Sequence, residues 1–195
     1  MERSVRPSCL RWIPLLLLLS GCPRDDAARP HLVPEPRPRT GGTAPPSAPT
    51  PPAPPLALDV EARAALEGAL GSYETIRARL AGDAIEGVAD AARVLADGLA
   101  GVKGEARPAL ERAIDRARAL AAASSIEPAR GAFAELSEAL IELLRRAPDL
   151  QTGRLVFRCP MATGYGKWIQ TKAPLENPLF GSKMLTCGEA SDWSE

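Results

Sequence analysis

The segment EPARGAFAELSEALIELLRR, residues 127–146, decides the predicted fold because its apolar residues recur with helical spacing. Phe133, Leu136, Leu140 and Leu143 fall on one face of such a helix. A proline suits its first turn, two arginines complement the dipole at its end, and a second proline stops it. The segment therefore predicts an amphipathic helix whose apolar face needs partners.

Three upstream segments show the same periodicity. Leucine and alanine stripes predict a first helix capped by Asp59, a second capped by Asp83 and a third that begins near Pro108. Nothing polar recurs on the inward faces, so no di-metal carboxylate or haem site is indicated. We predict a mainly α protein: a four-helix antiparallel bundle over residues 59–148, followed by a small Cys/Met- and aromatic-containing irregular or β module over residues 149–195.

Residues 1–21 have the features of an export signal. Three arginines precede a short apolar run, which is too short to span a bilayer, and the segment ends in Leu19-Ser20-Gly21-Cys22. This tetrad resembles the lipobox of bacterial lipoproteins, and the resemblance implies that Cys22 carries lipid and anchors the mature protein to a membrane. The alternative is an ordinary secretory signal whose cleavage site precedes a cysteine.

Residues 22–58 comprise the lipidated cysteine and a predicted disordered tether. Twelve of the 20 prolines lie between Pro23 and Pro55, and such a segment cannot bury enough apolar surface to fold. His31, the only histidine, lies here and is interpreted as a solvated linker residue. Because Pro23 replaces the aspartate of the common inner-membrane retention signal, we expect a periplasm-facing protein on the outer rather than the inner membrane.

The composition argues against several classes of function. The 24 basic residues balance the 24 acidic residues, which predicts no nucleic-acid partner. The predicted folded part has no histidine to activate a serine or cysteine. It also has no CxxC motif, glycine-rich phosphate loop or zinc-protease motif. We therefore expect a protein that is not an enzyme.

Soft donor atoms gather near the C-terminus. Cys9 leaves with the signal and Cys22 carries lipid, so only Cys159 and Cys187 remain in an oxidising compartment. Met161 and Met184 lie beside them in sequence. Thiolate and thioether ligands favour Cu(I) or Ag(I), whereas a structural zinc site normally needs more cysteines or histidines. These four residues are the candidate metal ligands.

The same two cysteines have a simpler use. A Cys159–Cys187 disulfide would close a long loop and stabilise the fold by roughly 3.5 kcal/mol in the chain-entropy model. A small module with little core benefits from such a cross-link. Free or redox-switching thiols are the third alternative, and the sequence leaves all three open.

The predicted module contains two short strands, at residues 155–157 and 167–170. A rigid turn at residues 177–181 would bring Met184 and Cys187 back towards Cys159. The aromatic residues of the module are expected to form a small core rather than a ligand-stacking platform: Phe157, Tyr165, Trp168, Phe180 and Trp193.

A set of residues resembles the pattern of a bacterial domain family of unknown function: Arg130, Phe133, Leu136-Ser137, Cys159-Pro160-Met161, Trp168-Ile169-Gln170, Asn177-Pro178-Leu179-Phe180-Gly181 and Met184-Leu185-Thr186-Cys187-Gly188. That family occurs alone and at the C-terminus of periplasmic adaptor subunits of copper and silver efflux pumps. The resemblance would cover roughly residues 60–190 as one domain. Leu179 stands where the pattern has an aromatic residue, and the hairpin, lipoyl and barrel domains of the adaptors do not fit in this chain.

Two hypotheses of function follow. The first is a lipid-anchored periplasmic protein of copper or silver handling, which binds a soft metal ion and passes it to an efflux system. The alternative is a structural or interaction lipoprotein that contains a permanent Cys159–Cys187 disulfide.

Overall fold

The computed structural model describes residues 54–193, which lie within one compact unit, Pro49–Glu195. The predicted signal peptide, the lipidation site at Cys22 and residues 23–53 of the tether lie outside the described residues. Among the helices that the structure describes, none is both long and apolar enough to cross a membrane.

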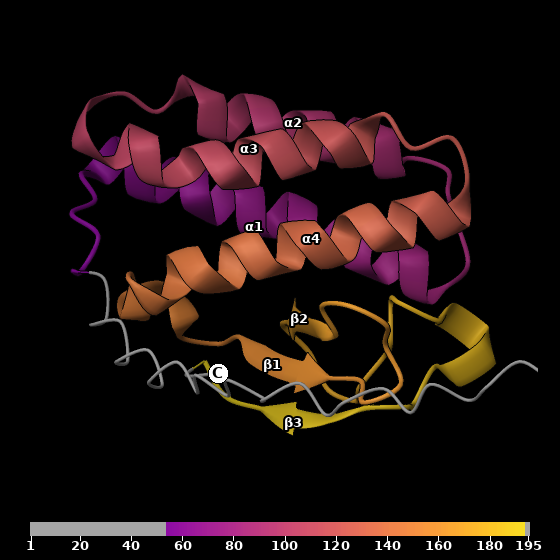
Figure 1. The fold of residues 1–195 in the computed structure, drawn as a ribbon. Helices are drawn as coiled ribbons and strands as arrows, with labels where there is room; N and C mark the ends of the chain where they lie inside the picture. Colours follow the sequence, from indigo (N-terminus) through magenta and orange to yellow (C-terminus); the bar gives the residue numbers. More distant parts are fainter. Residues whose placement is uncertain (1–53, 194–195) are drawn as a thin grey trace, which may run out of the picture. The chain divides into compact units, whose positions relative to one another are not determined.

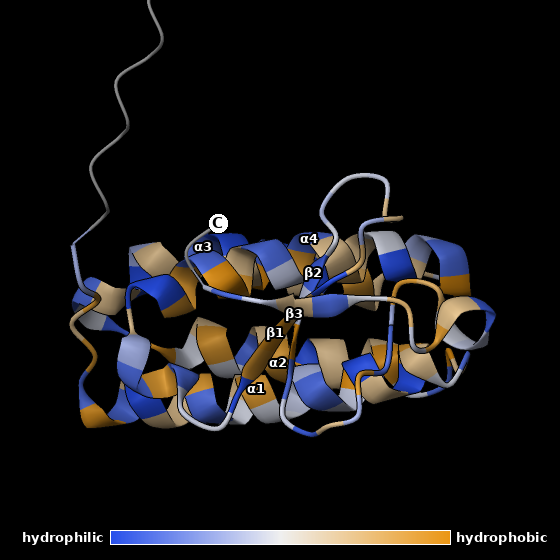
Figure 2. Ribbon diagram, turned by 90° about the horizontal axis from the view of Figure 1, so that it is seen from below, coloured by the Kyte–Doolittle hydropathy of each residue, from blue (hydrophilic) through white to orange (hydrophobic). Residues whose placement is uncertain are grey.

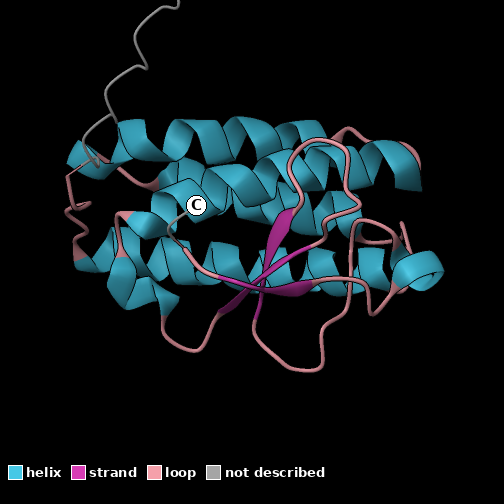
Figure 3. Cartoon of the chain, turned by 60° about the horizontal axis from the view of Figure 1, so that its bottom comes forward, coloured by secondary structure: helices cyan, strands magenta, loops and turns pink. Residues whose placement is uncertain are grey.

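The described part is mainly helical with a small antiparallel sheet, which confirms the predicted fold class at this level (Figures 1 and 3). The four α-helices are α1 (Val60–Ala81), α2 (Val88–Gly101), α3 (Arg107–Ala121) and α4 (Ile126–Arg145). Single 3-10 turns are η1 (Gly104–Ala106), η2 (Pro148–Gln151) and η3 (Gly181–Met184). The strands are β1 (Leu155–Arg158), β2 (Lys167–Gln170) and β3 (Glu189–Ser191), of which β3 was not predicted.

The helix starts differ in how well the sequence predicted them. Asp59 caps α1 as expected, because its Oδ1 accepts a hydrogen bond from the Ala62 amide at 2.7 Å. Asp83 does not cap the second helix: α2 begins at Val88, and its N-cap is Gly87 in a left-handed conformation. Asp83 itself has a left-handed backbone conformation, with φ of 57°. Its carboxylate contacts Arg130 and Ser182, which are distant in the sequence.

The helices pack in chain order, each against the next, and α1 and α4 also contact β2 (Figure 1). Each helix contains both hydrophobic and hydrophilic residues (Figure 2). This mixture is typical of amphipathic helices, which bury one face and expose the other. The predicted inward residues of α4 are all buried: Phe133, Leu136, Leu140 and Leu143. The periodicity of the quoted segment therefore identified the core face correctly.

The sheet has the order β2-β1-β3, and both of its strand pairs are antiparallel. All four residues of β2 are buried. Trp168 lies opposite Phe157 in the register, and their ring centroids are 5.9 Å apart. Instead of a separate aromatic core, Trp168 and Ile169 belong to the same hydrophobic cluster as the helices, because β2 packs directly on α1 and α4. Phe157, Tyr165, Phe180 and Trp193 pack against this cluster, so the aromatic residues do contribute to a core, but they share it with the helices.

Phe133 is central to this common core, because it is fully buried and stacks on Tyr73 with ring centroids 4.8 Å apart. We expect Phe133→Ala to lower the free energy of unfolding by about 3–5 kcal/mol, since it leaves a cavity in well-packed surroundings. Chemical denaturation measures this change. Val94→Ala, at a side chain that is 63% exposed, serves as the control and should change stability by less than about 0.5 kcal/mol. Equal effects of the two substitutions would contradict the assignment of the core.

Candidate functional site

Cys159 and Cys187, the two cysteines among the described residues, lie together, and we call them the dithiol. Cys159 directly follows β1 and is only 2% exposed, whereas Cys187 lies in the turn before β3 and is half-buried. Their Sγ atoms are 3.6 Å apart, and one thiol donates a hydrogen bond to the other sulfur. Although 28 positions separate them in the chain, the fold brings both thiols to contact distance.

The two predicted thioether ligands lie in less defined positions. Met161 is 61% exposed, two residues beyond Cys159. Met184 ends η3 and is half-buried, and its carbonyl accepts a hydrogen bond from the Cys187 amide at 2.9 Å. Within residues 54–193, no group of three or more His, Cys, Asp or Glu side chains could hold a metal ion. A third ligand at the dithiol is therefore not supplied by a His, Cys, Asp or Glu side chain of these residues.

A tight loop fixes the Cys159 side. The amide of Cys159 donates to the Gly166 carbonyl at 2.9 Å, and the Cys159 carbonyl accepts from the Ala162 amide at 3.2 Å. A Cβ atom on Gly166 would lie 2.8 Å from the Cys159 carbonyl oxygen, which is too close. Glycine is therefore required where this loop returns to β1.

Asn177 organises the Cys187 side. Its side chain is completely buried, and its Nδ2 donates to the Cys187 carbonyl at 2.8 Å. Its Oδ1 accepts from the amides of Leu179 and Phe180 at 2.8 and 3.2 Å, and its own amide donates to the Leu185 carbonyl at 2.7 Å. One side chain thus holds both ends of residues 177–187, which we call the site turn.

A salt bridge between Arg130 and Asp83 ties the site turn to the helices, and we call this pair the clamp. Arg130, on α4, donates from Nε to the Pro178 carbonyl at 3.2 Å and from a terminal nitrogen to the Leu80 carbonyl at 3.0 Å. The same nitrogen forms the salt bridge to Asp83. The other carboxylate oxygen of Asp83 accepts from the Ser182 amide at 3.0 Å. The clamp therefore joins α1, α4 and the site turn.

The clamp leaves no room for a side chain at Gly181. This residue has φ of 59°, and a Cβ atom there would lie 1.9 Å from Asp83 Oδ1. Hydrogen bonds from Ser182, and then from Arg130, lower the pKa of Asp83 to about 2. Because this value lies below the unfolded value of about 3.9, the clamp stabilises the fold at neutral pH. That contribution is lost as the pH falls from about 4 towards 2.

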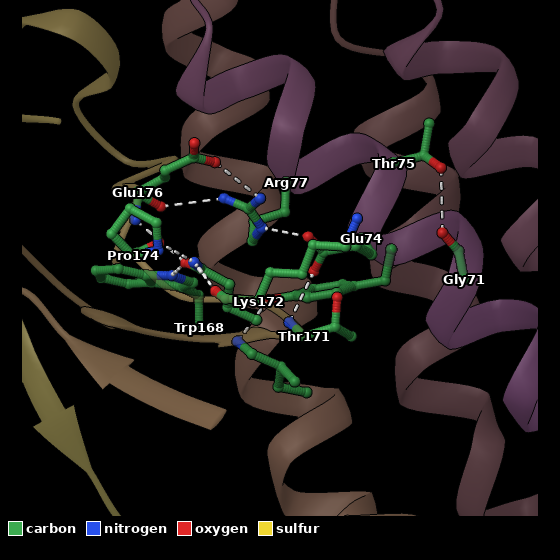
Figure 4. Close-up of polar contacts among 12 residues, drawn as sticks. Gly71, Glu74, Thr75, Arg77, Trp168, Thr171, Lys172, Pro174 and Glu176 are labelled. Atoms are coloured by element: carbon green, nitrogen blue, oxygen red, sulfur yellow. Dashed lines mark hydrogen bonds and ion pairs between the residues drawn. The ribbon is translucent and has the colours of Figure 1, made fainter. Parts of the chain in front are cut away.

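A second contact between helix and turn lies nearby (Figure 4). The side chain of Arg77, only 4% exposed, donates to Glu74 Oε1 at 2.9 Å. It also donates to the carbonyl of Glu176 at 3.2 Å and to its carboxylate at 3.1 Å. Glu176 immediately precedes the site turn, so α1 holds the start of that turn through this arginine.

The surroundings of Cys187 favour its protonated form. The hydrogen bond with Cys159, then burial and then the neighbouring thiolate charge raise the pKa of Cys187. A thiol with a raised pKa is a poor nucleophile at neutral pH. The arrangement suits a ligand pair or a disulfide better than an activated nucleophile, since a bound metal ion deprotonates its thiol ligands.

Sequence reasoning identified the two cysteines and predicted a rigid turn at residues 177–181, but it did not identify the contacts that hold this turn. Arg130 and Asn177 belonged to the quoted resemblance pattern, and Asn177 also began the predicted turn. Asp83 was interpreted as a helix cap, because Gly82-Asp83 interrupts the first helical segment and aspartate commonly begins the next one.

The raised pKa of Cys187 can be tested directly. In the reduced protein, the pH midpoint for alkylation of Cys187 by iodoacetamide should lie above the value of about 8.5 for an ordinary thiol. Cys159→Ala should lower this midpoint, because it removes the first cause of the shift. Mass spectrometry of the modified peptide over a pH series measures both midpoints. An unchanged midpoint in the variant would show that Cys159 does not act on Cys187.

No protein-family model, curated protein or solved structure matches this chain significantly. The resemblance to the domain family of copper and silver efflux adaptors therefore rests on the quoted residues and stays a prediction.

Proposed function

We propose that this chain is a lipid-anchored protein of the bacterial cell envelope whose dithiol binds Cu(I) or Ag(I). The observation that carries the proposal is the 3.6 Å separation of the two Sγ atoms, which come from distant parts of the sequence. Thiolates are soft ligands and select such ions.

The spacing of the sulfur atoms fits a metal with more than two ligands. With metal–thiolate bonds of about 2.3 Å, as for zinc, sulfurs 3.6 Å apart give a sulfur–metal–sulfur angle of about 100°. This angle is near tetrahedral rather than linear. It favours one or two additional ligands, and the thioethers of Met161 and Met184 are the soft donors nearest in sequence.

The N-terminal residues and the helices are consistent with a metal site located in the cell envelope. The Leu19-Ser20-Gly21-Cys22 tetrad and the proline-rich tether favour a lipid anchor at Cys22, facing the periplasm and more suited to the outer than the inner membrane. The four helices, packed in chain order, favour an antiparallel bundle that supports the site. A metal-efflux system is the proposed recipient of the ion, and the proposed role is not enzymatic.

Titration of the reduced protein with Cu(I) under anaerobic conditions tests the proposal. We expect about one Cu(I) per chain, and at least a tenfold weaker affinity in Cys159→Ser because a thiolate ligand is lost. Met184→Leu and Met161→Leu should weaken binding less, since thioethers carry no charge. Competition with a chromophoric Cu(I) chelator measures the affinities.

Thr186→Ala is the matched control, because Thr186 is exposed and directly precedes Cys187 in the same turn. It should bind Cu(I) like the natural chain. No uptake by the reduced natural chain, or equal affinity in Cys159→Ser, would refute metal binding by the dithiol.

A second candidate function has support from the same distance. Two thiols 3.6 Å apart need only a small side-chain rotation to reach the bond length of about 2.05 Å in a disulfide. In an oxidising compartment the pair would then be a permanent cross-link in a structural or interaction lipoprotein.

The two functions differ in the oxidation state of the protein taken from cells. A structural disulfide predicts no free thiol in protein that is denatured in the presence of an alkylating reagent, whether or not the cells were grown with copper. Metal binding predicts two free thiols after the metal is removed. A thiol count by mass spectrometry distinguishes the two functions. The variant Cys187→Ser, in which only Cys159 of the pair remains, is the reference for one free thiol.

A further inference from the structure

We propose that Asn177 is the positioning residue of the dithiol, and that the clamp of Arg130 and Asp83 anchors its turn to the helices. The inference deepens the proposed function, because it names what holds the two ligands together before any metal binds. It also applies if the two thiols form a disulfide.

The two cysteines are held in different ways. Cys159 is continuous with β1, the central strand of the sheet, and its position follows from pairing on both sides. Cys187 lies outside the helices and strands, and the pairing of β3 begins only at Glu189, beyond Gly188. The separation of the sulfur atoms therefore depends on what fixes the turn that precedes Gly188.

Asn177 is the side chain that fixes it. Its Nδ2 donates to the carbonyl of Cys187 itself, while its Oδ1 accepts two amides at the other end of the turn. A buried amide that uses both its nitrogen and its oxygen is costly to disturb, since each unpaired group loses its hydrogen bond without gaining water. Asn177 thus links the position of Cys187 to the start of the site turn.

The clamp links that start to the helices. Pro178 and Ser182 lie on either side of Gly181, and each contributes a backbone group to Arg130 or Asp83. Arg130 also holds the end of α1 through the Leu80 carbonyl. The position of the turn is therefore set by the helical core, so that the core holds the two sulfur atoms at 3.6 Å through this chain of contacts.

The decisive variant is Asn177→Asp, because the carboxylate keeps the acceptor for Leu179 and Phe180 but cannot donate to Cys187. The readout is the equilibrium constant for closing the Cys159–Cys187 disulfide in a buffer of reduced and oxidised glutathione. In this exchange two protein thiols are oxidised to one disulfide, while oxidised glutathione is reduced to two thiols. We expect the constant to fall about tenfold, the effect of one lost buried hydrogen bond.

Two further variants separate positioning from general stability. Asp83→Asn weakens the clamp without substituting a residue of the site turn, and should lower the constant several-fold. Tyr73→Phe removes buried hydrogen bonds to Ser137 and Ile169, outside the site turn, and should lower the free energy of unfolding while the constant stays unchanged. If the equilibrium constant falls by the same factor in Tyr73→Phe, the effect of Asn177 reflects general stability and not positioning of the dithiol.

If Asn177→Asp does not fold, Asp83→Asn decides the question by the same measurement. An unchanged constant in every folded variant of Asn177 and Asp83 overturns the inference. The same variants are titrated with Cu(I), and each should bind it more weakly than the natural chain does. If the natural chain binds no Cu(I), the proposed function fails, while the glutathione measurement still decides whether Asn177 positions the dithiol.

Discussion

The free edge of β2 is the constraint on which the rest of this structure depends. β2 is an edge strand, yet all four of its residues are buried, so its outward backbone amides need acceptors other than water. Helix α1 supplies an acceptor for the Ile169 amide, which donates to the Tyr73 hydroxyl at 3.2 Å. Directly after the strand, the amide of the exposed Thr171 donates to Glu74 Oε2 at 3.3 Å. Amides two residues apart point the same way along a strand. Two neighbouring side chains of a helix therefore take the place of a fourth strand.

The same face of α1 extends this contact to the candidate site. The hydroxyl of Tyr73 also shares a hydrogen bond of 2.7 Å with Ser137 on α4. The buried hydroxyl therefore has hydrogen-bond partners and does not pay the energetic penalty of an unpaired polar group. Glu74 uses its second oxygen to hold Arg77, which in turn holds Glu176 at the start of the site turn. The C-terminal residues are thus not a module with a core of their own. They complete the helical core, and the helices determine where the cysteines lie.

The helices could be predicted because their signals are local. Asp59 caps the helix that begins one residue later, and the inward face of α4 follows from spacing alone. The failures concern contacts over long distances in sequence: Asp83 and Ser182 are 99 positions apart, so no local pattern shows that the carboxylate is already engaged. β3 has three residues without an apolar alternation, and only its pairing with β1 makes it a strand. For the site, residue type identified Cys159 and Cys187 as partners, but their separation depends on such distant contacts.

The dithiol cannot serve both proposed functions at once. A disulfide uses both sulfur atoms as bonding partners and leaves no thiolate for a metal, whereas a bound ion keeps the thiols apart and deprotonated. The separation of 3.6 Å already fits a metal-bound pair, and a disulfide needs only a small side-chain rotation. Since Cys159 is buried and Cys187 is half-buried, an oxidant or a metal ion must reach the pair from the Cys187 side. Under both proposals the residues that hold the site turn position the two sulfur atoms, and the supply of oxidant or metal ion decides between the two reactions.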